Sequence, residues 1–595
     1  MRLELHRMVP DNPRLAEAWD ALVDLTDRPE IFYTYEWARA VSHAYQESLR
    51  PWLLLAYEGS ELIGVASLAI DSANRACFLG GTTADYCDLI SSAEDRPALL
   101  ELTLSELEKA GIHDIVLANL PEDSLTMASL LPVAKSHRYH VGSRLGYECA
   151  RVELGSPERR SKLKTAIKKK KSYRYSMNVL SRQGPVVLSH LTKWADIEPA
   201  LPEFYVAHVA RFLATHRLSN IARAERRIFL TELGRLLSRC GWLALSQIRV
   251  ADMPIAWNFG FRFKGSWFYY QPTFETSLEQ YSPGMCLLSG IIAEACDSDG
   301  LQIVDLGLGA EGYKERFAES IRRTLYVTLS RSRAHHLREV TRYRLAEMVK
   351  RSPRLESSVR YALACVGAAR PRRNEAQPRS EHPSARKFLR GVLPERQARL
   401  FYEYSEQAEH LSPMHGMGRL VPIDRRILAD AVMLYEADKP VQDYLLRAAS
   451  RLFLPGAEGF VLMNIEGRPI EFYWFAPFEG FFLEDLQAQL TTSDLRAVLI
   501  YDVFTPDAAR RSSVVGIAAL VEQLRCNGRV PWASVAVDDL SWAHALEREG
   551  FILRYSLVSR RTPAGHKITQ VNALHSSQPI TVCPSGSRRR SGIPQ

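Results

Sequence analysis

The stretch 265–317, GSWFYYQPTFETSLEQYSPGMCLLSGIIAEACDSDGLQIVDLGLGAEGYKERF, contains the most informative pattern of the chain. It predicts an aromatic strand over 266–271, a loop over 281–284 and an apolar helix over 285–296. A second strand is predicted over 301–306, and a glycine-rich loop follows it. This order of strand, loop, helix and strand is typical of an α/β fold.

The loop before the predicted helix has the composition of an anion site. Ser282, Pro283 and Gly284 precede the helix, and Met285 opens it. The first backbone N–H groups of a helix have no partner within the helix and carry partial positive charge. A glycine lets a ligand approach the main chain closely. The loop therefore suits a phosphate or pyrophosphate group, although the same residues also make an ordinary helix cap.

The loop after the second strand, DLGLGAEGYK over 305–314, carries carboxylates, a phenol and an amine. Ligands of open α/β sheets bind at the carboxyl edge of the strands, where this loop begins. An aspartate in a glycine loop can serve only to cap its turn, and a tyrosine can serve only to pack. Catalytic roles are therefore hypotheses for the candidate side chains Asp305, Glu311, Tyr313, Lys314 and, from the earlier turn, Glu275.

The same residues resemble the acetyltransferase domain of CelD/BcsL-type proteins, a branch of the GNAT superfamily close to the FemAB aminoacyl transferases. The pattern of that domain is an aromatic strand, then P-x-[YF]-[DE], S-P-G and D-x-G-x-G-x-E-x-Y-K. The matching residues are Pro272, Phe274, Glu275, Ser282, Pro283, Gly284, Asp305, Gly307, Gly309, Glu311, Tyr313 and Lys314. Glu275 departs from the family, which usually has aspartate there.

The resemblance implies an acyltransferase whose donor is acetyl-CoA or another acyl-CoA. The donor's pyrophosphate would lie over the 282–285 helix start, and Lys314 would bind phosphate or pair with Glu311. The implied acceptor is an amino sugar, a glycan precursor or a small amine in cell-envelope or exopolysaccharide synthesis. One alternative is FemAB-like transfer from charged tRNA to a peptidoglycan precursor. Another is a non-catalytic scaffold.

Direct attack of an acceptor amine or hydroxyl on a thioester needs a base, a donor for the oxyanion and an acid for the thiolate. The candidate bases are Glu311, Asp305 and Glu275. Tyr313 is the candidate acid, because the superfamily often uses a phenol late in its fold. The sequence contains no G-x-S-x-G motif of a covalent nucleophile.

Length and composition set wider bounds. At 595 residues the chain is expected to hold several domains, because single cores rarely exceed about 250–300 residues. The net charge of +8 favours anionic partners such as CoA, nucleotides or tRNA. The nine scattered cysteines form no zinc-ligand spacing, and no metal is expected. No uncharged apolar run reaches the ~18 residues that span a bilayer, so a cytoplasmic location is expected.

A basic run, RRSKLKTAIKKKKSYRYSMNVLSR over 159–182, contains no acidic residue. It is either a solvated helix face or a contact surface for a phosphate-bearing ligand, such as the donor's tail or a nucleic acid. No nucleic-acid recognition motif accompanies it, so DNA binding is not expected.

The expected fold class is α/β, with tandem GNAT-like folds whose mixed central sheets are flanked by helices. In the first part, Asp85, Tyr86 and Asp88 match an Asp-Tyr-x-Asp stretch of the family, and a structural or acceptor-lining role is expected. The predicted parts are a non-catalytic N-terminal GNAT-like half (1–155), the acyltransferase domain (156–332), a helical and Arg/Pro-rich connector (333–398), a C-terminal GNAT-like domain (399–575) and a disordered tail (576–595).

The C-terminal part offers a second possible cofactor loop. Arg511 and Gly516 match the ends of the superfamily's R-x-x-G-x-G/A phosphate loop. Val514 stands at the inner glycine position, where its side chain would crowd the approach of a pyrophosphate to the backbone. The sequence therefore predicts a GNAT-like domain here without deciding whether it binds a cofactor.

Overall fold

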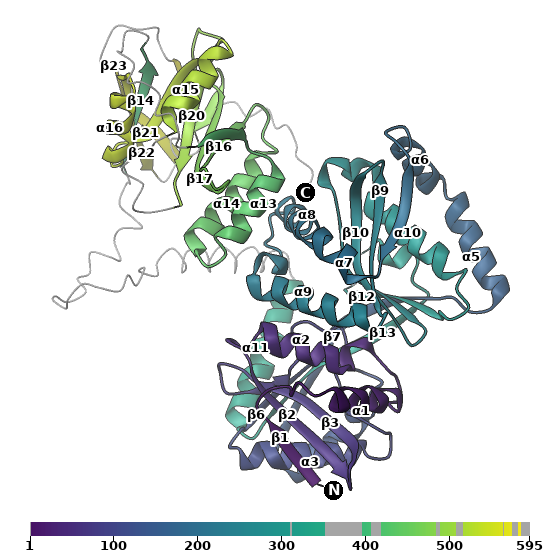
Figure 1. Ribbon diagram of the computed structural model, residues 1–595. Coiled ribbons are helices and arrows are strands. Elements are labelled where there is room, and N and C mark those ends of the chain that lie inside the picture. Colours follow the sequence, from purple (N-terminus) through teal and green to yellow (C-terminus); the bar gives the residue numbers. More distant parts are fainter. Residues whose placement is uncertain are drawn as a thin grey trace. The chain divides into compact units, whose positions relative to one another are not determined.

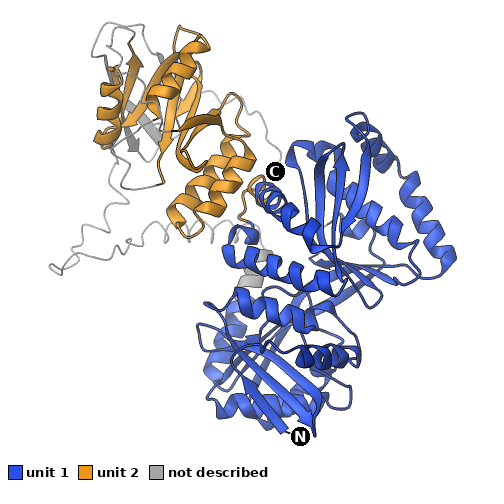
Figure 2. Cartoon of the chain, in the orientation of Figure 1, with its two compact units in different colours: residues 1–211, 219–374 blue, residues 212–218, 375–595 orange. Residues whose placement is uncertain are grey.

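The computed structural model describes residues 2–309, 312–351, 396–405, 418–483, 488–506, 516–562, 565–573 and 581–584. It divides into two compact units, residues 1–211 with 219–374 and residues 212–218 with 375–595 (Figure 2). Each unit contains a sheet with both parallel and antiparallel strand pairs, flanked by helices. The predicted fold class, α/β with mixed sheets, is confirmed.

The first part of unit 1 is an α/β segment that leads into a long strand (Figure 1). Its elements are β1 (Arg2–His6), α1 (Pro13–Asp24), α2 (Tyr35–Ala44), β2 (Arg50–Glu58), β3 (Glu61–Ile70), β4 (Ala76–Phe78), β5 (Ile90–Ser91), α3 (Arg96–Lys109), β6 (Asp114–Pro121), α4 (Leu125–Ser136) and β7 (His140–Glu153).

The second part of unit 1 begins with two consecutive helices and ends with a helix that reaches the last described residue before 396. Its elements are α5 (Pro157–Lys169), α6 (Lys171–Leu180), β8 (Val186–Leu191), α7 (Trp194–Ile197), α8 (Leu201–Leu213), α9 (Ala224–Arg239), β9 (Leu243–Val250), β10 (Met253–Phe263), β11 (Ser266–Phe274), α10 (Pro283–Ala295), β12 (Ile303–Leu308), β13 (Ser320–Ser330) and α11 (Arg333–Arg351).

One 13-stranded sheet runs through both parts of unit 1, in the order β1-β2-β3-β4-β6-β13-β7-β12-β11-β10-β9-β8, with β5 beside β3. The junction is made by β13, which pairs antiparallel with both β6 and β7. Because β7 also pairs with β12, strands from the two parts meet in the middle of the sheet. The domain boundaries proposed at residues 155 and 332 follow β7 and β13 and stay predictions.

The helix that the sequence predicts over 285–296 is α10. Its apolar positions Leu287, Leu288, Ile291 and Ile292 have no exposed surface and pack with Trp267 of β11 in one core cluster. Full burial of such a side chain contributes roughly 1.5–3 kcal/mol. The core packing therefore fixes α10 against the sheet, with its first turn at the end of β11.

Unit 2 has the same kind of layered arrangement. Its elements are β14 (Arg396–Tyr404), β15 (Arg419–Pro422), α13 (Arg425–Leu434), α14 (Lys439–Arg451), β16 (Glu458–Met463), β17 (Pro469–Pro477), β18 (Phe481–Leu483), β19 (Ala488–Thr491), β20 (Ala497–Phe504), α15 (Ile517–Cys526), β21 (Val530–Ala536), α16 (Leu540–Arg548), β22 (Phe551–Thr562), β23 (Gly565–Ala573) and β24 (Thr581–Pro584). Its main sheet has the order β15-β16-β17-β20-β21-β14-β22-β23, and β18-β19-β24 form a small second sheet.

The predicted connector and tail fall partly on residues that the structure describes. Of the connector, α11 and the start of β14 are described, and residues 352–395 lie outside the described residues. Of the predicted disordered tail, residues 581–584 form β24, and residues 576–580 and 585–595 lie outside the described residues. Among the described helices, none has both the length and the apolar character that a membrane span requires.

A strand, a helix and a parallel strand recur three times in the described chain. The repeats are β4-α3-β6 and β11-α10-β12 in unit 1, and β20-α15-β21 in unit 2. In each repeat the parallel pairing is short. In the second repeat it covers only 266–268 against 303–305, although β11 continues to Phe274. The two strands therefore part beyond Phe268 and Asp305, and we call the region between their diverging ends, beside the start of the helix, the opening.

Candidate functional site

The opening between β11 and β12 is the candidate active site. The last paired residues are Phe268 on β11 and Asp305 on β12. Beyond this point β12 follows β7, with an irregularity in the register. Gly307 and Gly309 have φ angles of +71° and +99°, which L side chains rarely adopt. The glycines thus let the chain turn at the end of β12, and Asp305 lies at the point where the two strands part.

Asp305 is a buried carboxylate held by three donors. It accepts hydrogen bonds from the Tyr86 hydroxyl at 2.8 Å, from Arg151 Nε at 2.9 Å and from the Gly307 N–H at 2.9 Å. Its residue is 1% exposed. Charge-assisted bonds of this kind suit a fixed carboxylate anion. Both carboxylate oxygens of Asp305, one of the candidate bases, thus accept hydrogen bonds.

Asp85 lies on the other side of the same glycine loop. A Cβ atom added to Gly307 would lie 2.8 Å from Asp85 Oδ2, so only a glycine accommodates this approach. The Asp85 side chain forms no hydrogen bond or ion pair with any described residue, although the residue is only 7% exposed. Burial, and secondly the charge of Asp305, raise the pKa of Asp85 to about 8, while the charge of Lys314 lowers it. Such a group exchanges its proton in the pH range where a general base works.

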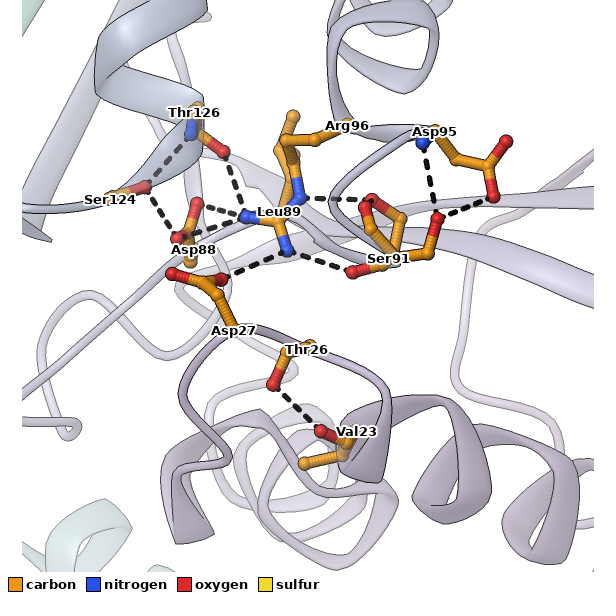
Figure 3. A network of polar contacts seen from close by, with 11 residues as sticks. Val23, Thr26, Asp27, Asp88, Leu89, Ser91, Asp95, Arg96, Ser124 and Thr126 are labelled. Carbon is orange, nitrogen blue, oxygen red and sulfur yellow. Dashed lines mark hydrogen bonds and ion pairs between the residues drawn. The ribbon is translucent and has the colours of Figure 1, made fainter.

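A buried polar network anchors the loop that carries Asp85 and Tyr86 (Figure 3). Asp88 accepts a hydrogen bond from the Ser124 hydroxyl at 2.6 Å and lies 3.1 Å from the guanidinium of Arg96. Arg96 also donates to the hydroxyl and the carbonyl oxygen of Ser91, at 2.9 and 3.0 Å. Asp88 thus fixes the loop, and Asp85 and Tyr86 lie toward β12. The structural or acceptor-lining role expected for the Asp-Tyr-x-Asp stretch stays a prediction.

A second ionic cluster backs Asp305. Arg322 of β13 forms an ion pair with Glu30, and Arg151 of β7 lies 3.7 Å from the same carboxylate. Both guanidinium groups also lie over the Tyr86 ring, at 4.5 Å for Arg322 and 5.5 Å for Arg151. Burial raises the pKa of Glu30 to about 7, and the two arginines act in the opposite direction. The cluster ties the first part of the chain to the strands that form the site.

The start of α10 has the geometry of a tight helix cap. Ser282 is exposed and adopts a left-handed conformation, with φ of 51°. A Cβ on Gly284 would lie 3.0 Å from the ring of Phe274, so the glycine permits close packing of the helix start against the end of β11. Met285 is partly buried against the core of α10. The predicted anion loop therefore lies beside the opening between β11 and β12.

Arg211 is a functional candidate that the sequence analysis missed. Its guanidinium lies 4.8 Å from the centre of the Phe274 ring and donates to the Pro272 carbonyl at 2.9 Å. This contact brings a cation from α8 to the end of β11. The sequence around Arg211 does not indicate this contact, because Arg211 lies far from residues 272–274 along the chain.

The remaining predicted residues lie around the glycine loop or outside the described chain. The buried Lys314 donates to the carbonyls of Leu308 and Gly309 at 2.8 and 3.4 Å. Tyr313 packs against the core of α10. The backbone N–H of Glu275 donates to the Ile255 carbonyl at 2.8 Å, directly after β11. Glu311 lies outside the described residues. These catalytic and binding roles stay predictions.

The second possible cofactor loop is described at one end only, because Arg511 and Val514 lie outside the described residues. Gly516 precedes α15, and its N–H donates to the carboxylate of Glu471 at 3.0 Å. The Tyr473 hydroxyl donates to the same carboxylate, which is buried. The Gly516 N–H at this helix start is thus already hydrogen-bonded to the side chain of Glu471. Within the part of the chain that the structure describes, no cluster of three or more His, Cys, Asp or Glu residues is arranged to hold a metal ion.

The sequence profile of the Acetyltransferase (GNAT) domain family matches residues 168–315. The match includes β11, α10, β12 and Asp305, and it ends before β13. Residues 168–315 are therefore similar to GNAT acetyltransferase domains, and the predicted resemblance is confirmed for these residues. Asp85 lies outside the match. The relation to FemAB enzymes and a GNAT-like nature of the C-terminal part stay predictions. None of the curated proteins compared with the chain matches it.

Solved structures give distant matches. FemX is 11% identical with a TM-score of 0.38, and the match covers 57% of this chain and 99% of FemX. The C-terminal domain of a lysylphosphatidylglycerol synthetase from Agrobacterium fabrum, named as putative, is 12% identical with a TM-score of 0.33, over 55% and 94% of the two chains. A tandem GNAT protein from the clavulanic acid biosynthesis pathway is 11% identical with a TM-score of 0.32, over 55% and 98%.

Proposed function

We propose that unit 1 is an acyl-CoA-dependent acyltransferase that acetylates an amine or a hydroxyl. The observation that carries the proposal is the arrangement of Asp85 and Asp305 at the opening beside α10, within and next to a GNAT domain. One carboxylate is held by three donors, and the other has no partner among the described residues. The two therefore suit different tasks in one reaction.

The helix start at 282–285 is the proposed site for the pyrophosphate of the donor. The backbone N–H groups of this first turn and the partial positive charge of α10 favour an anion. The guanidinium of Arg211 adds positive charge near the end of β11. The acyl group would lie in the opening, where the β12-facing edge of β11 has no paired register beyond Phe268.

Asp85 is the proposed general base. The acceptor nitrogen or oxygen attacks the thioester carbon, the C–S bond breaks, and Asp85 takes the proton that the acceptor loses. Asp305 holds the Gly307 backbone that faces Asp85, so it is a positioning residue. Tyr313 is the proposed acid for the thiolate. Glu311 and Glu275 remain candidate bases from the sequence, and Lys314 a candidate phosphate ligand.

The acceptor class is proposed from the resemblance alone, as an amino sugar, a glycan precursor or a small amine. The test is release of free thiol from acetyl-CoA, measured with a panel of amino sugars and amines. The proposal expects turnover with at least one acceptor and a loss of about 100-fold or more in Asp85→Asn. Turnover that is unchanged in Asp85→Asn would remove Asp85 from the mechanism. Absence of turnover and of acetyl-CoA binding would refute the function.

A second candidate function is transfer from charged tRNA. It is favoured by the surface of α5 and α6, which pack against α10 at the edge of unit 1 (Figure 1). Lys164 pairs with Asp297 and Arg159 with Glu319, but many cations of this run are exposed without an ion pair to the described residues. These are Lys162, Lys168, Lys169, Lys171, Arg174 and Arg182.

The two functions are separated by a binding experiment. Filter binding of aminoacylated tRNA to the intact protein and to Lys168→Gln/Lys169→Gln measures affinity and its dependence on salt. Tight binding that weakens in the variant and falls steeply with salt supports the tRNA function. Acetyl-CoA turnover without tRNA binding supports the first function.

A further inference from the structure

A cavity lies between α11 and the strands β7 and β13. Its volume is about 410 Å³, and its lining includes Gly142 to Arg144 on β7, Tyr326 and Thr328 on β13, and residues from Glu339 to Arg344 on α11. Pockets for small molecules usually measure about 300–1,000 Å³. The cavity is therefore large enough for a compact ligand.

Arg144 is the central residue of this cavity. Its guanidinium lies over the ring of Tyr326 at 4.0 Å and over the ring of Tyr343 at 4.8 Å. Stacking of this kind contacts the flat faces of the guanidinium, whereas its N–H donors lie in the plane. Arg144 forms no hydrogen bond or ion pair with any described residue. The tyrosines thus orient a cation whose donor edge is available to a ligand.

The charge balance of the lining is positive. Arg342 and Arg344 of α11 also line the cavity, and both are exposed and form no ion pair within the described chain. Glu339 is the acidic member of the lining. The hydroxyl of Thr328 donates to the Gly142 carbonyl at 3.5 Å, and the Ser143 hydroxyl adds a further polar group. Three guanidinium groups against one carboxylate favour an anion with more than one negative charge.

We propose that this cavity binds a small phosphate-bearing anion. A guanidinium donates two parallel hydrogen bonds to a phosphate, and a multiply charged phosphate matches the excess of arginine. The volume accommodates a diphosphate or a small organic phosphate. The cavity holds this ligand between β13 and α11.

The cavity is distinct from the site at Asp305. Arg144 and Arg151 lie on the same strand, and a rise of about 3.3 Å per residue puts them roughly 23 Å apart. The ligand of the cavity is therefore neither the acyl donor nor its acceptor at the opening. The proposal does not depend on the acyltransferase function.

The test is calorimetric titration of inorganic pyrophosphate into the full-length protein, Arg144→Gln and Arg342→Gln/Arg344→Gln. The matched control is Arg239→Gln, which removes one exposed cation at the end of α9. The proposal expects saturable binding that is about tenfold weaker or more in both cavity variants, because charged hydrogen bonds are lost. The control should stay within about twofold of the wild type.

Two results would overturn the proposal. One is the absence of saturable binding to the wild type. The other is wild-type affinity in Arg342→Gln/Arg344→Gln, because this would locate the pyrophosphate elsewhere, for example at the start of α10. Both arginines of that variant are exposed, so their replacement does not disturb the core, and thermal melting checks that Arg144→Gln is folded.

Discussion

Replacement of Asp85 by asparagine should stabilise the protein while it removes the proposed base. The folded protein raises the pKa of Asp85 to about 8 from an ordinary value of 3.8. Between pH 3.8 and about pH 8, Asp85 is therefore protonated in the folded state and ionised in the unfolded state. Each pKa unit corresponds to about 1.4 kcal/mol. At pH 7 the cost to the folded state is then about 4 kcal/mol, and asparagine, which is always neutral, does not incur it.

The sign of the pH dependence follows from the same shift. The stability contributed by protonated Asp85 is present below pH 3.8 and is lost as the pH rises toward about 8. We expect the melting temperature of Asp85→Asn to exceed that of the wild type, by more at pH 8 than at pH 5. Thermal melts of both proteins, followed by circular dichroism at these two pH values, measure the difference. Asp299→Asn, at an exposed position, is the control and should change neither value.

The kinetic counterpart is a rise of kcat/KM with pH. A general base acts when it is ionised, so the acetyl-transfer rate should increase up to about pH 8 and then level off. Equal melting temperatures of Asp85→Asn and the wild type at both pH values would refute the reasoning, because they would mean that Asp85 is solvated and ionised like a surface aspartate.

Three other changes test the geometry. Gly307→Ala should lower stability by about 1–3 kcal/mol through backbone strain, and its Cβ would also meet Asp85; a thermal melt at pH 7 like that of the wild type would contradict this contact. Arg322→Gln should cost about 3–5 kcal/mol, because it removes the closer of the two guanidinium partners of the buried Glu30 and leaves only Arg151 at 3.7 Å. Adding Glu30→Gln should recover part of this loss in urea unfolding, and no recovery would argue against the pair. Tyr86→Phe removes one hydrogen bond to a buried carboxylate and should cost about 1–3 kcal/mol; an unchanged unfolding midpoint would contradict its role.

The local part of the site could be predicted from the sequence. The periodicity of apolar residues and the Ser-Pro-Gly cap predict a helix over 285–296, and α10 spans Pro283–Ala295. The predicted strands over 266–271 and 301–306 correspond to β11 and β12, with ends that differ by a few residues. Caps, glycines and strand composition are local signals, so they locate elements well.

The partners of Asp305 could not be predicted in the same way. Tyr86 lies 219 positions away in the sequence, and it meets Asp305 only because β7 and β13 join the two parts of unit 1 in one sheet. The burial of Arg96 and the low exposure of Arg151 could not be predicted from the sequence either, because arginines are mostly exposed in proteins. The raised pKa of Asp85 depends on that burial and on a neighbouring carboxylate. Asp85 and Tyr86, on which the proposed site depends, are therefore residues for which the sequence predicted only a structural or acceptor-lining role.

The proposed function depends on the binding of the acyl donor at the start of α10. Calorimetric titration of acetyl-CoA into the intact protein, Ser282→Asp and Ser72→Asp tests it most directly. Both serines are exposed, so each variant adds one negative charge without disturbing the core. We expect binding to the wild type and to Ser72→Asp, and an affinity at least about tenfold lower in Ser282→Asp, where the new carboxylate would repel the donor's pyrophosphate. Equal affinity in all three proteins, or no binding to any of them, would contradict it.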